Sequence, residues 1–127
     1  MRICVVDENQ LVRGALQEFL TELGHAVVSV CENRELLGVL HMSEQLPGLI
    51  IAECRCGCAG NADELRQIHR LVPDTPIIAT IDRGILPDTR EAISHGIYAF
   101  LRKPLHLSEL ELMLIRLSEN HPAVASS

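Results

Sequence analysis

The sequence lacks the long apolar runs and basic clusters that would indicate a membrane segment or a nucleic-acid surface. No apolar stretch in its 127 residues approaches the roughly 20 residues of a membrane-spanning helix. The formal net charge is −6, and no run of Lys and Arg is present. The chain leads directly into an apolar segment, so no secretory signal is recognisable. We therefore expect a cytoplasmic domain that binds neither membrane nor nucleic acid.

Aromatic residues, lysine and a disulfide framework are also missing or scarce. Aromatics make up 2% of the chain, so the core has to be built from Leu, Ile, Val and Ala. The length favours one domain with a single core. Arginine outnumbers lysine ten to one, and the single lysine, Lys103, stands directly before Pro104. The odd number of cysteines indicates a reducing compartment. They are Cys4, Cys31, Cys54, Cys56 and Cys58.

Short apolar runs alternate with amphipathic segments along the chain. We expect strands at residues 2–6, 25–30, 49–53, 77–81 and 98–102. Helices are expected to begin at Asn9, Asn33, Asn61, Asp88 and Leu107, where the three asparagines act as N-caps. The last helix should end near Ser118, and residues 119–127 read as a flexible tail or the start of a linker. This alternation predicts an α/β fold with a parallel sheet.

Charged residues stand where the apolar runs end. Asp7 and Glu8 follow the first run, Glu53 closes the third, Asp82 follows the fourth, and Lys103 follows the fifth. The carboxyl ends of parallel strands meet at one edge of a sheet, which is where open α/β folds place their sites. The sequence therefore predicts a functional site at this edge.

Four motifs in order resemble the receiver domain of two-component response regulators. They are Val5-Val6-Asp7-Glu8, the acid-terminated third strand after Pro47, the segment Pro76-Ile77-Ile78, and Gly96 through Phe100 to Lys103-Pro104. The resemblance covers about residues 1–118. It implies a flavodoxin-like fold of five strand–helix units with strand order 2-1-3-4-5.

The resemblance also implies roles for individual positions. In receiver domains, two acids after the first strand hold Mg²⁺. An aspartate ending the third strand accepts a phosphoryl group from a histidine kinase, and a Ser or Thr ending the fourth strand binds it. By position, Asp7 and Glu8 are the metal-side acids and Glu53 completes the acidic pocket. Phe100 is the aromatic that moves with the hydroxyl, and Lys103 is the lysine before a cis proline.

Two positions depart from the family pattern. The phosphoacceptor position holds Glu53, whose extra methylene moves the carboxylate by about an ångström, a misplacement that can cost roughly a hundredfold in rate. The hydroxyl position holds Ile81, and Thr80 stands one place early, where strand alternation turns it to the opposite face. The longer arm of Glu53 can instead form an ion pair with Lys103. We interpret the chain as a pseudo-receiver that works without phosphorylation and is not an enzyme.

Alternatives to this interpretation remain open. The chain could still be a phosphorylatable receiver in which Glu53 or a nearby acid accepts phosphate slowly. Mg²⁺ is not certain, although Asp7, Glu8, Glu53 and the carbonyl of Arg55 could bind it weakly.

The cysteine-rich loop offers a different possibility. Cys54, Cys56 and Cys58 form a Cys-x-Cys-x-Cys run that could bind a soft metal or act as a redox-sensitive thiol pair. The run lacks the second cluster of a structural zinc site. The simpler interpretation is that these are small loop residues.

The last predicted helix carries more apolar residues than one buried face requires. Its core stripe consists of Leu110, Met113, Leu114 and Leu117. Leu112 and Ile115 point away from that stripe, which indicates a contact surface. In receiver domains the fourth helix, fifth strand and fifth helix form the usual partner face. We therefore expect a protein partner or a homodimer on this face, with a histidine kinase as a candidate partner.

Overall fold

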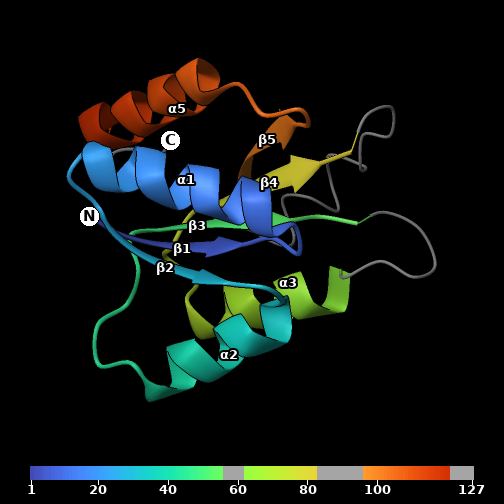
Figure 1. Cartoon of the computed structure of the whole chain (residues 1–127). Helices are drawn as coiled ribbons and strands as arrows, with labels where there is room; N and C mark the ends of the chain where they lie inside the picture. The colour runs from blue at the N-terminus through green and yellow to red at the C-terminus, as the bar shows by residue number, and fades with distance from the viewer. Residues whose placement is uncertain (56–61, 83–95, 121–127) are drawn as a thin grey trace.

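The computed structural model describes residues 1–55, 62–82 and 96–120. Within them, five parallel strands form one sheet in the order β2-β1-β3-β4-β5. The strands are β1 (Arg2–Val6), β2 (Ala26–Val30), β3 (Leu49–Glu53), β4 (Ile77–Ile81) and β5 (Ile97–Arg102). The helices α1 (Gln10–Glu22) and α5 (Leu107–Asn120) cover one face, whereas α2 (Asn33–Met42) and α3 (Ala62–Leu71) cover the other (Figure 1). The predicted flavodoxin-like fold and strand order are confirmed.

The first helix begins where the sequence predicts. Asn9 Oδ1 accepts hydrogen bonds from the backbone N–H groups of Leu11 and Val12, at 2.9 and 3.2 Å. These bonds satisfy donors that have no partner inside the helix. The chain leaves α1 through Gly24, whose φ of 92° is costly for residues that carry a Cβ.

The second helix is not capped by Asn33, and that prediction was wrong. Asn33 is the first residue of α2, and Glu32 occupies the N-cap position without a side-chain hydrogen bond. The Asn33 side chain is 4% exposed and its Oδ1 has no hydrogen-bond partner. It lies in the interior, so it cannot reach the free N–H groups of the first turn.

Other boundaries differ from the sequence prediction by one or two residues. β2 begins at Ala26, β5 begins at Ile97, and α5 continues to Asn120. Frayed ends commonly produce such differences. The predicted cap at Asn61, the helix predicted from Asp88, and most of the predicted tail lie outside the described residues.

Two apolar clusters sandwich the sheet. The cluster below α1 and α5 includes Ile3, Leu20, Ile51, Ile78 and Leu114. The cluster above α2 and α3 includes Cys4, Leu36, Ile50, Leu65 and Ile77. Residues that alternate along each strand thus enter opposite clusters, as expected for a sheet covered on both faces. Burial holds the strands in one register and fixes where their charged ends lie.

The last helix, α5, has one buried and one exposed set of apolar side chains. Leu110, Leu114 and Leu117 are buried, whereas Leu112 and Ile115 are 55% and 45% exposed. The predicted division of α5 into a buried stripe and an exposed apolar pair is confirmed, except that Met113 is only partly buried. None of the described helices has the length and apolar character needed to cross a membrane.

Candidate functional site

The carboxyl ends of β1, β3 and β5 bring three charged side chains into contact. Lys103 Nζ lies 2.7 Å from Glu53 Oε2 and 3.1 Å from Asp7 Oδ2. The register places Val6 beside Ala52, so Asp7 and Glu53 follow at the same level of the sheet. The predicted ion pair between Glu53 and Lys103 is therefore present, and the Lys103-Pro104 peptide is cis as predicted.

Glu53 makes a hydrogen bond with each of its carboxylate oxygens. Oε2 accepts from Lys103 Nζ, and Oε1 accepts from the backbone N–H of Glu8 at 2.8 Å. Partial burial acts to raise the pKa of Glu53, but the bonds from Lys103 and from the Glu8 amide outweigh it. The pKa of Glu53 therefore lies below its ordinary value, and the side chain is ionised at neutral pH.

Lys103 is held between two carboxylates. Burial acts to lower its pKa, but the contacts with Glu53 and Asp7 outweigh burial and raise the pKa above its ordinary value. Asp7 is 1% exposed, and its Oδ1 accepts from the backbone N–H of Asn9 at 2.8 Å. The ammonium of Lys103 thus neutralises a buried charge that would otherwise be costly.

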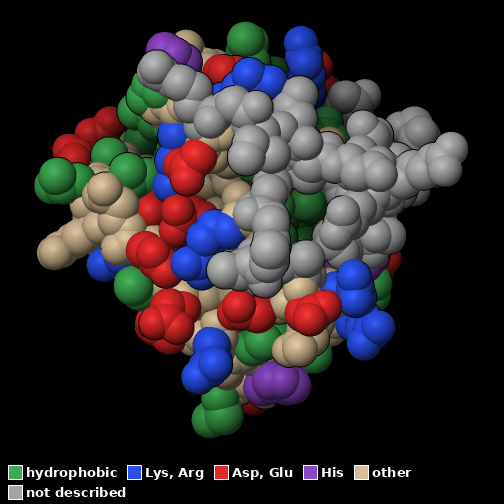
Figure 2. Space-filling model, turned by 90° about the vertical axis from the view of Figure 1, so that its right-hand side faces the viewer, with side chains coloured by type: hydrophobic (Ala, Val, Ile, Leu, Met, Phe, Trp, Pro, Cys, Tyr) green, Lys and Arg blue, Asp and Glu red, His purple; other side chains and the backbone are tan. Residues whose placement is uncertain are grey.

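Two arginines complete this cluster, and the sequence analysis missed both as side-chain partners. Arg55 Nη1 lies 3.0 Å from Glu8 Oε1, and both side chains are about half exposed. Arg13 Nη1 donates to the backbone carbonyls of Asp7 and Glu8, at 2.8 and 3.4 Å. A possible signal was their spacing, because Arg55 is two residues beyond the acid that ends β3 and Arg13 is in the first turn of α1. On the described part of this edge, acidic and basic side chains interleave (Figure 2).

Thr80 and Ile81 occupy the end of β4 as neighbours with different surroundings. Thr80 pairs in register with Glu53, but its Oγ1 is buried and has no hydrogen-bond partner. Ile81 is 2% exposed, and its backbone carbonyl accepts from the N–H of Lys103 at 2.8 Å. No hydroxyl therefore contacts Glu53 from this strand. Asp82, the next residue, is exposed.

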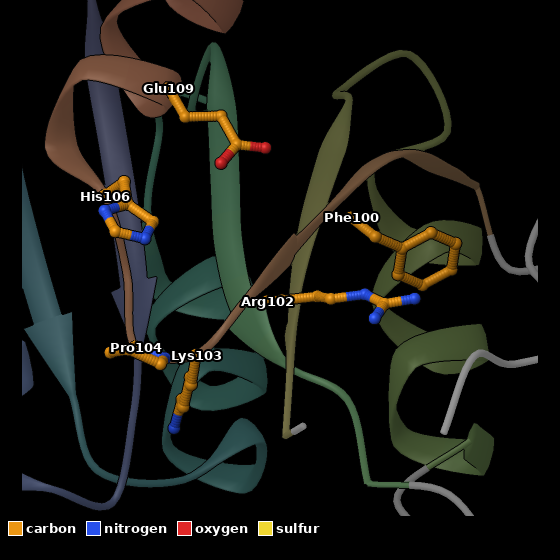
Figure 3. A pocket seen from close by; sticks show the side chains of 6 residues that line it. All are labelled: Phe100, Arg102, Lys103, Pro104, His106 and Glu109. Carbon is orange, nitrogen blue, oxygen red and sulfur yellow. The ribbon is translucent and has the colours of Figure 1, made fainter. Parts of the chain in front are cut away.

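Phe100 lies beside the charged cluster rather than in it. A pocket of about 310 Å³ is lined by Phe100, Arg102, Lys103, Pro104, His106 and Glu109. Phe100 and Arg102 extend to the same side of β5, whereas Lys103 extends away from the other labelled side chains (Figure 3). The ammonium of Lys103 therefore contacts Asp7 and Glu53 and does not point toward Phe100 and Arg102.

The cysteine-rich loop lies mostly outside the described residues. Cys54 is partly buried, and its backbone N–H donates to the carbonyl of Thr80 at 2.8 Å. Cys56 and Cys58 are not described. Cys4 is buried in the core. Among residues 1–55, 62–82 and 96–120, no group of three or more His, Cys, Asp or Glu side chains is arranged to hold a metal ion.

Comparison with known proteins gives one consistent family. The family model described as the response regulator receiver domain matches residues 3–115. The C4-dicarboxylate transport transcriptional regulatory protein DctD of Rhizobium meliloti is 30% identical over 108 residues, which are 85% of this chain and 23% of that protein. The virulence transcriptional regulatory protein PhoP of Salmonella typhimurium is 25% identical over 126 residues, 99% of this chain and 55% of that protein.

Solved structures agree on the fold. A response regulator receiver domain protein from Clostridium thermocellum superposes with a TM-score of 0.81 at 20% identity, covering 97% of this chain and 98% of that one. The chain spans about a quarter of the length of DctD and about half of PhoP.

Proposed function

Since this chain belongs to the response regulator receiver domain family, we propose that it transmits a signal through protein contacts without accepting a phosphoryl group. The ion pair between Glu53 and Lys103, with Nζ 2.7 Å from Oε2, carries this proposal. The lysine that a receiver directs at the phosphoryl group is here bound by the side chain at the acceptor position. The domain thus places the longer Glu53 carboxylate directly against this lysine.

The chemistry of the acceptor position supports the same conclusion. Phosphoryl transfer depends on positioning and on stabilisation of charge. Both oxygens of Glu53 are engaged in hydrogen bonds that favour the ionised carboxylate and hold it in place. Attack on a phosphodonor by either oxygen would weaken the hydrogen bond that this oxygen accepts.

The second departure from the family, Ile81, removes the hydroxyl that would bind a phosphoryl group. The side chain of Ile81 has no hydrogen-bond donor, and the hydroxyl of Thr80 is buried without a hydrogen bond. A phosphoryl group on Glu53 would therefore lack the hydroxyl contact that couples the site to Phe100 in receiver domains. We infer that the contacts of Glu53 with Lys103 and with the backbone of Glu8, and not an added phosphoryl group, fix the arrangement of this site.

The signal is transmitted through a protein contact surface and not through a reaction at the charged site. We propose that this cytoplasmic domain catalyses no reaction and contacts a protein partner, or a second copy, through β5 and the exposed residues Leu112 and Ile115 of α5. A histidine kinase is the class of partner that two-component signalling suggests. DctD and PhoP are named as transcriptional regulatory proteins, so we propose control of transcription as the class of output.

Treatment with a small phosphodonor tests the proposal. The protein is incubated with acetyl phosphate in millimolar Mg²⁺ while intact mass and backbone amide shifts are followed. We expect no mass gain and no shifts around Thr80, Ile81 and Phe100. The double variant Glu53→Asp with Ile81→Thr should recover part of the response, and each single variant should recover less because both residues act on one group. A mass gain mapped to Glu53 in the unmodified protein would overturn the proposal.

A further inference from the structure

Among the described residues, the charged cluster contains as many cationic side chains as anionic ones. Its three carboxylates belong to Asp7, Glu8 and Glu53. Lys103 binds two of them, at 3.1 and 2.7 Å, and Arg55 binds the third, at 3.0 Å. Arg13 adds a third positive charge by donating to the carbonyl of Asp7 at 2.8 Å. Three positive and three negative side chains give this cluster a formal charge of zero.

The Mg²⁺ that receiver domains hold between such acids does not fit this arrangement. Mg²⁺ requires nearly octahedral oxygen coordination and is bound through carboxylates that face it with negative charge. Here Oδ2 of Asp7 and Oε2 of Glu53 face an ammonium, and Oε1 of Glu8 faces a guanidinium. The remaining oxygen of Asp7 is bound to the N–H of Asn9, and that of Glu53 to the N–H of Glu8. A divalent cation that bound these three oxygens would have to compete with cations that the chain itself supplies.

We propose that Lys103 and Arg55 take the place of the metal ion, so that the regulatory edge of this receiver is assembled without Mg²⁺. Lys103 bridges the carboxylates at the ends of β1 and β3. Arg55 occupies the exposed acid, Glu8, on the solvent side of the same cluster. Arg13 holds the backbone of the turn that carries both β1 acids.

The two cations contribute unequally. Glu8 and Arg55 are about half exposed, and an exposed ion pair changes a competing equilibrium by at most about fivefold. Lys103 and Glu53 are 20% and 19% exposed, and Asp7 is 1% exposed, so water screens that part of the cluster less. Removal of Arg55 should therefore open a weak metal site, and removal of Lys103 a stronger one.

The proposal rests on the proposed function only in taking this edge as the regulatory site. Metal binding is measured without a phosphodonor, so a failure here is distinguishable from a failure of phosphorylation independence. Mg²⁺ is titrated into the protein by calorimetry, and Mn²⁺ is used as a paramagnetic probe that broadens the amide signals of Glu8 and Asn9. The unmodified protein should show no saturable binding in the millimolar range.

Variants identify the residues responsible. Arg55→Ala should show weak saturable binding of Mg²⁺, because removal of an exposed ion pair shifts the competing equilibrium by up to about fivefold. The added change Glu8→Gln should abolish that gain, because it removes the released ligand. Arg102→Ala is the matched control, since it removes one positive charge from the neighbouring end of β5 and should leave binding unchanged. Lys103→Met should show a melting temperature that rises with Mg²⁺, as expected when a ligand binds only the folded state.

Three outcomes would overturn the proposal. Saturable Mg²⁺ binding by the unmodified protein would show that the resident cations do not replace the metal. An equal gain in Arg102→Ala and Arg55→Ala would show an effect of net charge alone. Absence of any gain in both Arg55→Ala and Lys103→Met would show that neither side chain competes with a cation.

Discussion

Glu53 and Lys103 are 50 residues apart in the chain, yet their carboxylate and ammonium lie 2.7 Å apart at the sheet edge. The pair joins the end of β3 to the segment after β5 across β4, which lies between them. Lys103 is tied there a second time, because its backbone N–H donates to the carbonyl of Ile81 at 2.8 Å. One residue thus links the ends of three strands and controls how this edge is arranged.

Removal of the lysine should destabilise the fold strongly. Lys103→Met leaves the largely buried carboxylates of Asp7 and Glu53 without their cation, and we expect a loss of about 3 kcal/mol in the free energy of unfolding. Urea denaturation at neutral pH measures it. The double variant Lys103→Met with Glu53→Gln should lose less than the two single losses combined, because the second change removes an unpaired charge. Strict additivity would show that the ion pair does not couple the two side chains.

Acid should weaken the fold partly through Glu53. Its pKa is lowered from an ordinary value of 4.5, so its contribution to stability is complete above that value and is lost as the pH falls through the lower folded pKa. Glu53→Gln lacks this contribution, and its free energy of unfolding should fall less steeply below about pH 4.5. Denaturant titrations at several acidic pH values compare the two proteins. Parallel acid profiles would contradict the assignment.

The contribution of Lys103 to stability has the opposite dependence on pH. The pKa of Lys103 is raised above 10.5, so its contribution is complete below that value and is lost only as the pH rises through the folded pKa. The ion pair between Glu53 and Lys103 is therefore fully formed between pH 4.5 and pH 10.5. Changes of pH near neutrality should therefore leave the charges of Glu53 and Lys103 unchanged.

The fold was predictable from the sequence because burial on both faces leaves an unambiguous pattern. Apolar runs such as residues 49–53 are separated by capping residues and glycines, and these fix the element order. The contact between Glu53 and Lys103 was predictable because parallel strands end at one edge. Their relative position depends on backbone register, which the apolar pattern specifies.

The arginine contacts and the capping error had a different origin. Arg55 and Arg13 reach their partners through long side chains whose direction depends on local packing, and no periodic pattern records it. Asn33 has the residue type of a cap, but its side chain is buried and Glu32 takes the position. Propensity describes an isolated helix end, and tertiary packing overrode it here.

The unpartnered hydroxyl of Thr80 should make this residue dispensable for stability. Thr80→Val removes a buried oxygen that has no hydrogen bond, and we expect the free energy of unfolding to rise by about 1 kcal/mol. Thr75→Val is the matched control, because Thr75 is also buried but donates to the carbonyl of Pro47 at 2.9 Å. That variant should lose about 1 kcal/mol. A loss of stability in Thr80→Val would show that its hydroxyl has a partner in the folded protein.

The exposed apolar pair on α5 predicts association through this helix. Leu112 and Ile115 are 55% and 45% exposed, three residues apart on a helix whose other face is buried. Desolvation of these side chains would favour a partner or a second copy, so Leu112→Glu should weaken any dimer by placing a charge in the contact. Analytical ultracentrifugation over a range of concentrations measures the change. Leu46→Glu is the control, because Leu46 is 60% exposed in the segment before β3 and should not affect association. Equal weakening by both variants would show that net charge, and not the α5 surface, governs self-association. A protein that remains monomeric at high concentration, and whose partner binds Leu112→Glu as well as the unmodified chain, would rule out this surface as an interface.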